Sequence, residues 1–118
     1  SIDSKKISEN KWNTFTNYGK KDIGDTIQNV KIMEDLGVGE ILINSIDRDG
    51  QGNGMDNTLN KLVINSINIP VVCMGGVGEW SHFSETIDKC KPSGIAAANI
   101  FQYSENSIYK AHKYLFDK

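Results

Sequence analysis

Two aspartates flank an arginine directly after a strongly apolar run of the sequence. Asp47, Arg48 and Asp49 follow the run 41–43 and precede Gly50. Polar residues that follow a parallel strand lie at the functional edge of α/β folds. These carboxylates are therefore candidates for general acid–base chemistry. The alternative is that Asp47 and Arg48 only brace their loop, as charged loop residues usually do, and the spacing alone favours this bracing role.

Small residues follow the next two apolar runs. Gly75 and Gly76 come after one of them, and Ala98 and Asn99 come at the end of the other. Glycine lets backbone N–H groups approach an anion, and the start of a following helix adds a favourable dipole. A single glycine cluster is a weak signal, because tight strand-to-helix turns need glycine anyway. Two adjacent loops are a stronger signal, since the loops after strands seven and eight form the usual phosphate site of eight-fold barrels.

Strands are predicted where the sequence is apolar or alternating. The runs 41–43, 71–74 and 95–98 do not alternate with polar residues, which is typical of parallel strands covered on both faces. A first strand is predicted over 1–5, and a small hairpin over 12–18 precedes the first helix.

Four helices are predicted from apolar residues that recur at helical spacing. The first spans 25–36 and ends at Gly37, a left-handed stop. The second has its stripe over 59–67, with Asp56 and Asn57 as candidate N-caps. The third carries Trp80, Phe83 and Ile87, and the fourth carries Ile108, Ala111, His112 and Leu115. Four β/α units imply right-handed crossovers and a parallel sheet, either open and doubly wound or part of a barrel.

Size, charge and the length of the apolar runs exclude several classes of protein. The 118 residues are enough for one ordinary domain. They are about half of the roughly 250 residues that a complete eight-fold barrel uses. The net charge is -2 and there is no basic run, so nucleic acid is not expected as a partner. No apolar run approaches the ~20 residues that span a bilayer, and the N-terminus is polar. We expect a soluble, cytoplasmic protein with no membrane partner.

The cysteines and histidines show no metal-binding or redox spacing. Cys73 and Cys90 are expected to be reduced thiols without a chemical role. His82 and His112 have no partner at ligand spacing and are expected to pack or to lie on the surface. The sequence therefore predicts neither a metal site nor a cofactor.

The motifs taken together resemble a known family. The run Gly-Glu-Ile-Leu-Ile-Asn-Ser-Ile-Asp-Arg-Asp-Gly over 39–50 looks like the sixth-strand signature of the cyclase subunit of imidazole glycerol phosphate synthase. Further similarity follows in the right order in Ile69-Pro70, Gly75-Gly76-Val77-Gly78, His82-Phe83 and Ala97-Ala98-Asn99-Ile100-Phe101. The resemblance covers almost the whole chain. It implies the C-terminal half of a (β/α)8 TIM barrel, with 1–118 as one half-barrel domain of β/α units five to eight.

The resemblance also implies a reaction. In the family, ammonia from a glutaminase subunit reacts with a phosphorylated aminoimidazole carboxamide ribotide derivative, a lyase and cyclisation step of histidine biosynthesis. The resemblance places the catalytic acid–base role on Asp3 and Asp49, and the residues expected to bind phosphate are Gly50, Gly75, Gly76, Ala98 and Asn99. The family's other catalytic aspartate belongs to its first strand and has no counterpart here. Turnover by the isolated chain is therefore not expected.

Departures from the family pattern keep other functions open. Met74 replaces a serine that is usual before the paired glycines, which removes a hydroxyl that could meet phosphate. Asn44, Asn99 and Trp80 look more like paralogues that accompany sugar amidotransferases, where the barrel would pass ammonia to another enzyme. A non-catalytic half barrel that only binds phosphate is a further interpretation. The absence of an initiating Met favours a fragment of a longer gene product.

A half barrel is expected to associate with a second body. Four strands would leave two unpaired edges and an apolar concave face, which invite pairing. The sequence predicts a homodimer with its axis along the barrel, or a complementary N-terminal half barrel. The other expected partners are the glutaminase subunit and a phosphorylated small-molecule substrate.

Overall fold

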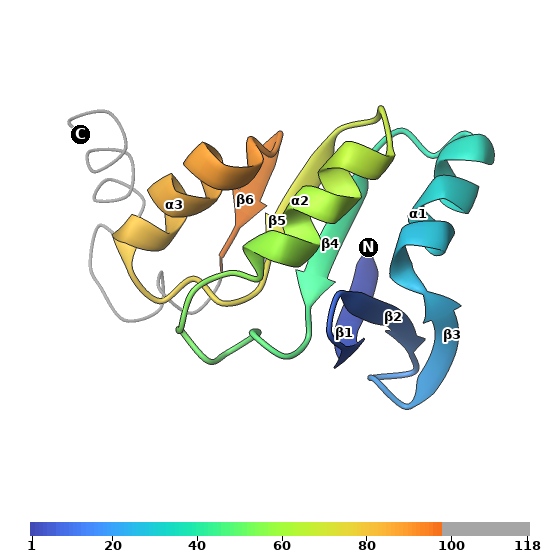
Figure 1. Cartoon of the computed structure of the whole chain (residues 1–118), viewed down its shortest axis with the longest axis horizontal. Helices are drawn as coiled ribbons and strands as arrows, with labels where there is room; N and C mark the ends of the chain where they lie inside the picture. Colours follow the sequence, from blue (N-terminus) through green and yellow to red (C-terminus); the bar gives the residue numbers. More distant parts are fainter. Residues whose placement is uncertain (98–118) are drawn as a thin grey trace.

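The computed structural model describes residues 1–97 of the chain, and these residues form one sheet with helices packed against it. Figure 1 shows the elements along the chain. They are β1 (Ile2–Ser8), β2 (Lys11–Thr16), β3 (Lys21–Asp25), α1 (Thr26–Asp35), β4 (Ile41–Ser45), α2 (Asn57–Ser66), β5 (Val71–Met74), α3 (Trp80–Cys90) and β6 (Gly94–Ala96). The strand order across the sheet is β3-β2-β1-β4-β5-β6.

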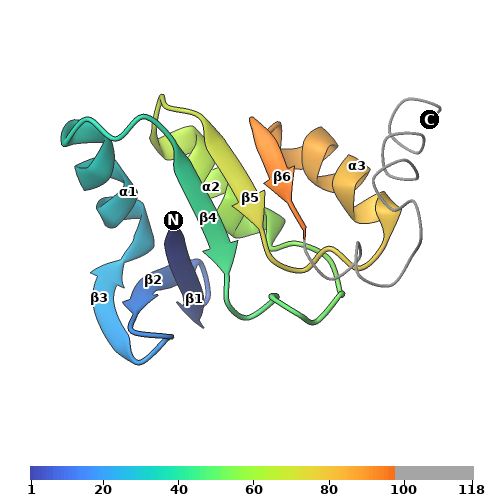
Figure 2. The same cartoon turned by 180° about the vertical axis from the view of Figure 1, so that it is seen from behind.

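The strands β1, β4, β5 and β6 run parallel and lie side by side in chain order. This arrangement confirms the four predicted parallel strands. β6 is shorter than its apolar run, because it ends at Ala96, and Ala98 lies outside the described residues. Since the strands are parallel, all four carboxyl ends lie at the same edge of the sheet, as Figure 2 shows.

The hairpin after β1 is larger than the sequence predicted. In place of a small hairpin over 12–18, the strands β2 and β3 pair with each other, and β2 also pairs antiparallel with β1 from Asp3 to Ser8. The turn at 17–19 has a positive φ at all three residues, which folds the chain back sharply. The prediction that the first strand has an unpaired outer edge is therefore wrong, because β2 occupies that edge.

Side-chain caps fix where the first two helices begin. Asp25, predicted as the first residue of a helix, is instead the N-cap of α1 and accepts the Gln28 N–H at 2.9 Å. Asp56 caps α2 in the same way and accepts the Leu59 N–H at 3.1 Å. Gly37 follows α1 at a φ of 89°, in keeping with the predicted left-handed stop. The helix predicted around 108–115 lies outside the described residues.

The helices α1, α2 and α3 lie on the same face of the sheet (Figures 1 and 2). The core between helices and sheet includes Val30, Leu59, Val63, Ile41, Ile43, Val71 and Cys73, all buried. Helices on one face match the wall of a barrel, whereas the doubly wound alternative would place helices on both faces. None of the helices in residues 1–97 is long and apolar enough to span a membrane.

Candidate active site

Two loops at the carboxyl edge of the sheet are joined backbone to backbone. The Gly54 N–H, in the loop after β4, donates to the Gly76 carbonyl, in the loop after β5, at 2.8 Å. A Cβ on Gly76, whose φ is 105°, would collide with the Gly54 carbonyl oxygen. A Cβ on Gly78 would likewise collide with Gly52. These glycines therefore allow the two loops to lie in direct contact.

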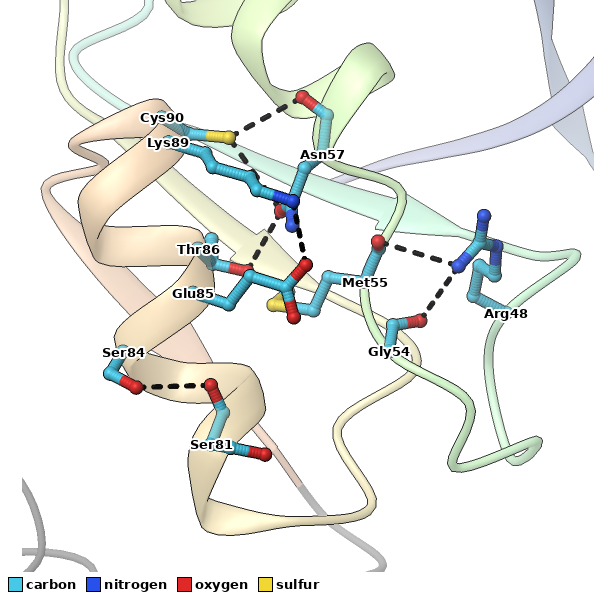
Figure 3. A network of polar contacts seen from close by, with 10 residues as sticks. All are labelled: Arg48, Gly54, Met55, Asn57, Ser81, Ser84, Glu85, Thr86, Lys89 and Cys90. Atoms are coloured by element: carbon cyan, nitrogen blue, oxygen red, sulfur yellow. Dashed lines mark hydrogen bonds and ion pairs between the residues drawn. The ribbon is translucent and has the colours of Figure 1, made fainter.

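Asp47 and Arg48 brace this edge. The Asp47 Oδ2 accepts the Lys6 N–H at 2.7 Å, which ties the loop to the end of β1. The Arg48 Nη1 donates to the carbonyls of Gly54 and Met55 at 3.1 and 3.4 Å, across its own loop (Figure 3). Both side chains thus hold the loop in place, which is the bracing role that the spacing favoured.

Asp49 has a different environment from its two neighbours. It is exposed, and within residues 1–97 its carboxylate makes no hydrogen bond or ion pair. With Gly50 it lines a small pocket, about 30 Å³, whose other walls are Met74, Gly75, Gly76, Val77, Ala96 and Ala97. The structure therefore brings together the predicted residues Asp49, Gly50, Gly75 and Gly76, and leaves one carboxylate among them available.

A larger cavity, about 510 Å³, lies beside the turn between β1 and β2. It is lined by Lys6, Trp12, Asp47 and neighbouring residues, and neither Asp3, Asp49 nor the paired glycines contribute to it. We place the candidate chemistry at the smaller pocket, because that pocket collects the residues able to move protons and to bind an anion.

Asp3 reaches this edge through the register of the sheet. Asp3 pairs with Asn44, Asn44 with Met74, and Met74 with Ala96, so the four residues form one row on one face. The Asn44 Nδ2 donates to the Asp3 Oδ1 at 3.2 Å. Met74 and Ala96 in turn line the small pocket. The two candidate carboxylates therefore lie at the same edge but on different elements.

Backbone donors for an anion remain at the turn after β5. The N–H groups of Gly76 and Val77 make no hydrogen bond to another described residue. The next two, Gly78 and Glu79, donate to the His82 Nδ1 at 3.0 and 3.2 Å. His82 is thus a structural residue that fixes the start of α3, and it leaves Gly76 and Val77 as the donors closest to the pocket.

The two thiols are buried and unpaired. Burial raises the pKa of Cys73 to about 12, and burial also raises the pKa of Cys90. The Cys90 Sγ donates to the carbonyl oxygen of Asn57 at 3.3 Å, so it helps to hold α3 against the start of α2 (Figure 3). Both sulfurs are therefore protonated at neutral pH and belong to the core.

Residues 1–97 hold no group of three or more His, Cys, Asp or Glu that could bind a metal ion.

Some predicted residues lie outside the described part, and one site residue was missed. Ala98, Asn99 and His112 are beyond residue 97. Asn44 was noted only as a departure from the family pattern, yet it contacts Asp3 directly. A signal for it was present in the sequence, since an amide directly after the apolar run of a buried strand needs a polar partner.

Comparisons with known proteins show which family the chain belongs to. Residues 1–107 match the family model described as "Histidine biosynthesis protein". The chain is 42% identical over 118 residues to the imidazole glycerol phosphate synthase subunit HisF of Dehalococcoides mccartyi, covering 99% of this chain and 46% of the relative. It is 41% identical over 108 residues to HisF of two Bacillus cereus strains, covering 91% of this chain and 43% of each relative.

The chain spans less than half the length of these relatives. The matched region nevertheless includes every described element from β1 to β6. The parallel strands, the helices on one face and the sequence similarity agree with one another. The chain belongs to the histidine biosynthesis protein family, whose members fold as TIM barrels, and it is similar to the HisF subunit over nearly all its residues.

Proposed function

We propose that this chain provides β/α units five to eight of an imidazole glycerol phosphate synthase cyclase barrel. One observation carries the proposal: Asp49 meets Gly75 and Gly76 at one pocket, at the edge of the sheet where Asp3 lies. The 42% identity to a HisF subunit supports the same function. The reaction would be the ammonia-dependent lyase and cyclisation step of histidine biosynthesis.

The two carboxylates would share the proton transfers. Addition of ammonia, loss of water and ring closure each move a proton at a neutral pH, where water alone is a poor acid and base. Asp49 is exposed and unpaired within the described residues, so it can exchange a proton with substrate. Asp3 is held on β1 by Asn44 and would be the second group. The carboxylate that the family carries on its first strand would come from the other half of the barrel.

The phosphate of the substrate would bind at the turn after β5. Two N–H groups, those of Gly76 and Val77, have no partner among the described residues and lie at the pocket that Asp49 also lines. Because the pocket is only about 30 Å³, the anion would sit at its mouth. Gly50, Ala98 and Asn99 would complete the site. Met74 offers no hydroxyl, so binding would depend on backbone donors.

The second half of the barrel is better explained as a complementary body than as a second copy of this chain. The relative from Dehalococcoides mccartyi is more than twice as long as the part that this chain covers, which is 46% of it, so units one to four would correspond to the remainder. The edge of β1 does not distinguish the two partners, because β2 pairs along it from Asp3 onward and would meet a strand of either one. Ammonia would come from a glutaminase subunit, and a cytoplasmic location fits the two free thiols.

A barrel that passes ammonia to a sugar amidotransferase is the second candidate. The observation that favours it is Asn44, an amide buried beside Asp3. In that case the complete barrel would bind a phosphorylated ligand and conduct ammonia without forming the imidazole ring. A half barrel that binds phosphate and catalyses nothing would neither conduct ammonia nor form the imidazole ring.

The deciding experiment measures ammonium-dependent product formation by the complete barrel, with this chain supplied together with units one to four. We expect Asp49→Asn to lower kcat on the order of a hundred to ten thousand-fold, since a general acid or base is lost. Asp47→Asn is the matched control, because Asp47 lies two positions before Asp49 and is also exposed. An asparagine at position 47 can still accept the hydrogen bond from the Lys6 N–H. Equal rates for the wild type and Asp49→Asn would reject the cyclase assignment.

A further inference from the structure

Asn44 and Ser45 are the two residues of β4 with polar side chains, and Asn44 is only 7% exposed. The two polar atoms of the Asn44 side chain differ in their hydrogen bonding. The Nδ2 donates to the Asp3 Oδ1 at 3.2 Å, whereas the Oδ1 is buried and has no hydrogen-bond partner among the described residues. A buried acceptor without a partner costs roughly 1 to 3 kcal/mol. The position therefore calls for a reason other than stability.

The orientation of the amide follows from its neighbours. An ionised Asp3 can only accept hydrogen bonds, so the NH2 group of Asn44 must face it. The Asn44 Oδ1 then points at Gly75, where it lies 3.0 Å from the position that a Cβ would take. Gly75 has a φ of 102°, and a Cβ there would also be 2.7 Å from the Ser45 carbonyl. The amide is thus held between a carboxylate and a glycine that must remain a glycine.

We propose that Asn44 is a positioning residue that holds the Asp3 carboxylate for proton transfer. The inference rests on the proposed function. Asn44 occupies the Asp3 Oδ1, which leaves the Oδ2 free of any hydrogen bond among the described residues. Gly75, against which the amide packs, precedes the free N–H groups of Gly76 and Val77. The packing against Gly75 keeps the amide in its orientation, while the phosphate donors themselves do not contact it.

The test compares Asn44→Leu with the wild type in the complete barrel, because leucine has the same number and branching of side-chain heavy atoms and no hydrogen-bonding group. We expect kcat to fall on the order of tenfold to a hundredfold, as for a catalytic group displaced by about 1 Å. KM and the Kd of inorganic phosphate should stay within about twofold, because Asn44 touches no phosphate donor. A purely structural role would instead lower the melting temperature and leave the kcat of the folded fraction unchanged.

Asp3→Asn separates this inference from the proposed function. If Asp3→Asn retains full turnover, Asp3 has no catalytic role and the positioning role of Asn44 falls with it, whereas the cyclase assignment fails only if the complete barrel forms no product. If Asp3→Asn loses turnover while Asn44→Leu keeps the wild-type kcat, only the positioning role of Asn44 is overturned.

A spectroscopic measurement covers the case in which Asn44→Leu does not fold. The side-chain NH2 protons of Asn44 are observed by NMR in the wild type and in Asp3→Asn. We expect the signal of the bonded proton to move upfield in Asp3→Asn, because a bond to a charged acceptor becomes a bond to a neutral amide. An unchanged signal would show that the hydrogen bond between Asn44 and Asp3 does not form, and would reject the inference.

Discussion

The two faces of the strands β4 and β5 carry different side chains. On the face under the helices, Ile41, Ile43, Val71 and Cys73 are all at most 3% exposed and form a dry apolar layer. On the other face the same strands carry Leu42, Asn44, Val72 and Met74, and this row includes the amide that contacts Asp3. We therefore expect the stability of this chain to depend mainly on the first face.

The largest expected difference between the faces is in stability. Ile43→Ala should lower the free energy of unfolding of this chain by about 2 to 5 kcal/mol, because Ile43 is completely buried and leaves a cavity. Leu42→Ala, one residue away on the opposite face, should cost less than half of that value, since Leu42 is only half-buried. Urea unfolding measures both.

Adding the other half of the barrel sharpens this comparison. The inner layer of a complete barrel is packed, so the cost of Leu42→Ala should then rise toward that of Ile43→Ala. Equal costs for the two variants in the chain alone would contradict the division of roles between the faces.

A smaller effect is expected at the two joined loops at the carboxyl edge of the sheet. Gly76→Ala introduces a Cβ that collides with the Gly54 carbonyl at a φ of 105°, so the two loops must separate. We expect phosphate affinity, measured by calorimetry, to fall on the order of tenfold or more as the free N–H groups move apart. Gly39→Ala is the control, because a Cβ at Gly39 meets nothing within 4 Å. Undiminished phosphate binding in Gly76→Ala would remove the pocket assignment.

The smallest effect concerns the thiols under the helices. Because burial raises the pKa of Cys73 to about 12, the native thiol stays protonated until the pH approaches that value, whereas an unfolded thiol ionises near 9.0. At pH 8.5 a thiol reagent should therefore label Cys73 slowly in the native chain and rapidly in denaturant. Labelling at the same rate in both conditions would show that this face is open to solvent.

Much of the fold was predictable because local chemistry specified it. The cap Asp56, the stop at Gly37 and the apolar runs mark the helices and parallel strands with few alternatives. The hairpin was less predictable. Its pairing with β1 depends on contacts between segments, which the alternation of apolar and polar residues does not reveal.

The site was predictable only in part. Asp49 and the paired glycines follow strands, so their shared edge could be inferred from the parallel order. Asp47 and Arg48 have the same kinds of side chain as catalytic residues, and only their hydrogen bonds identify them as braces. The contact between Asn44 and Asp3 needed the register of β1 against β4, because 41 residues separate the two in sequence.

The contact between the loops after β4 and β5 also limits how this barrel can be redesigned. The two loops have two meeting points, which are Gly54 against Gly76 and Gly52 against Gly78. A residue inserted between Gly52 and Gly54 would shift one meeting point relative to the other unless the second loop lengthened in step. Loops transplanted from a relative should therefore be moved as a pair, since either loop alone would lack the backbone of the other loop with which it makes contact.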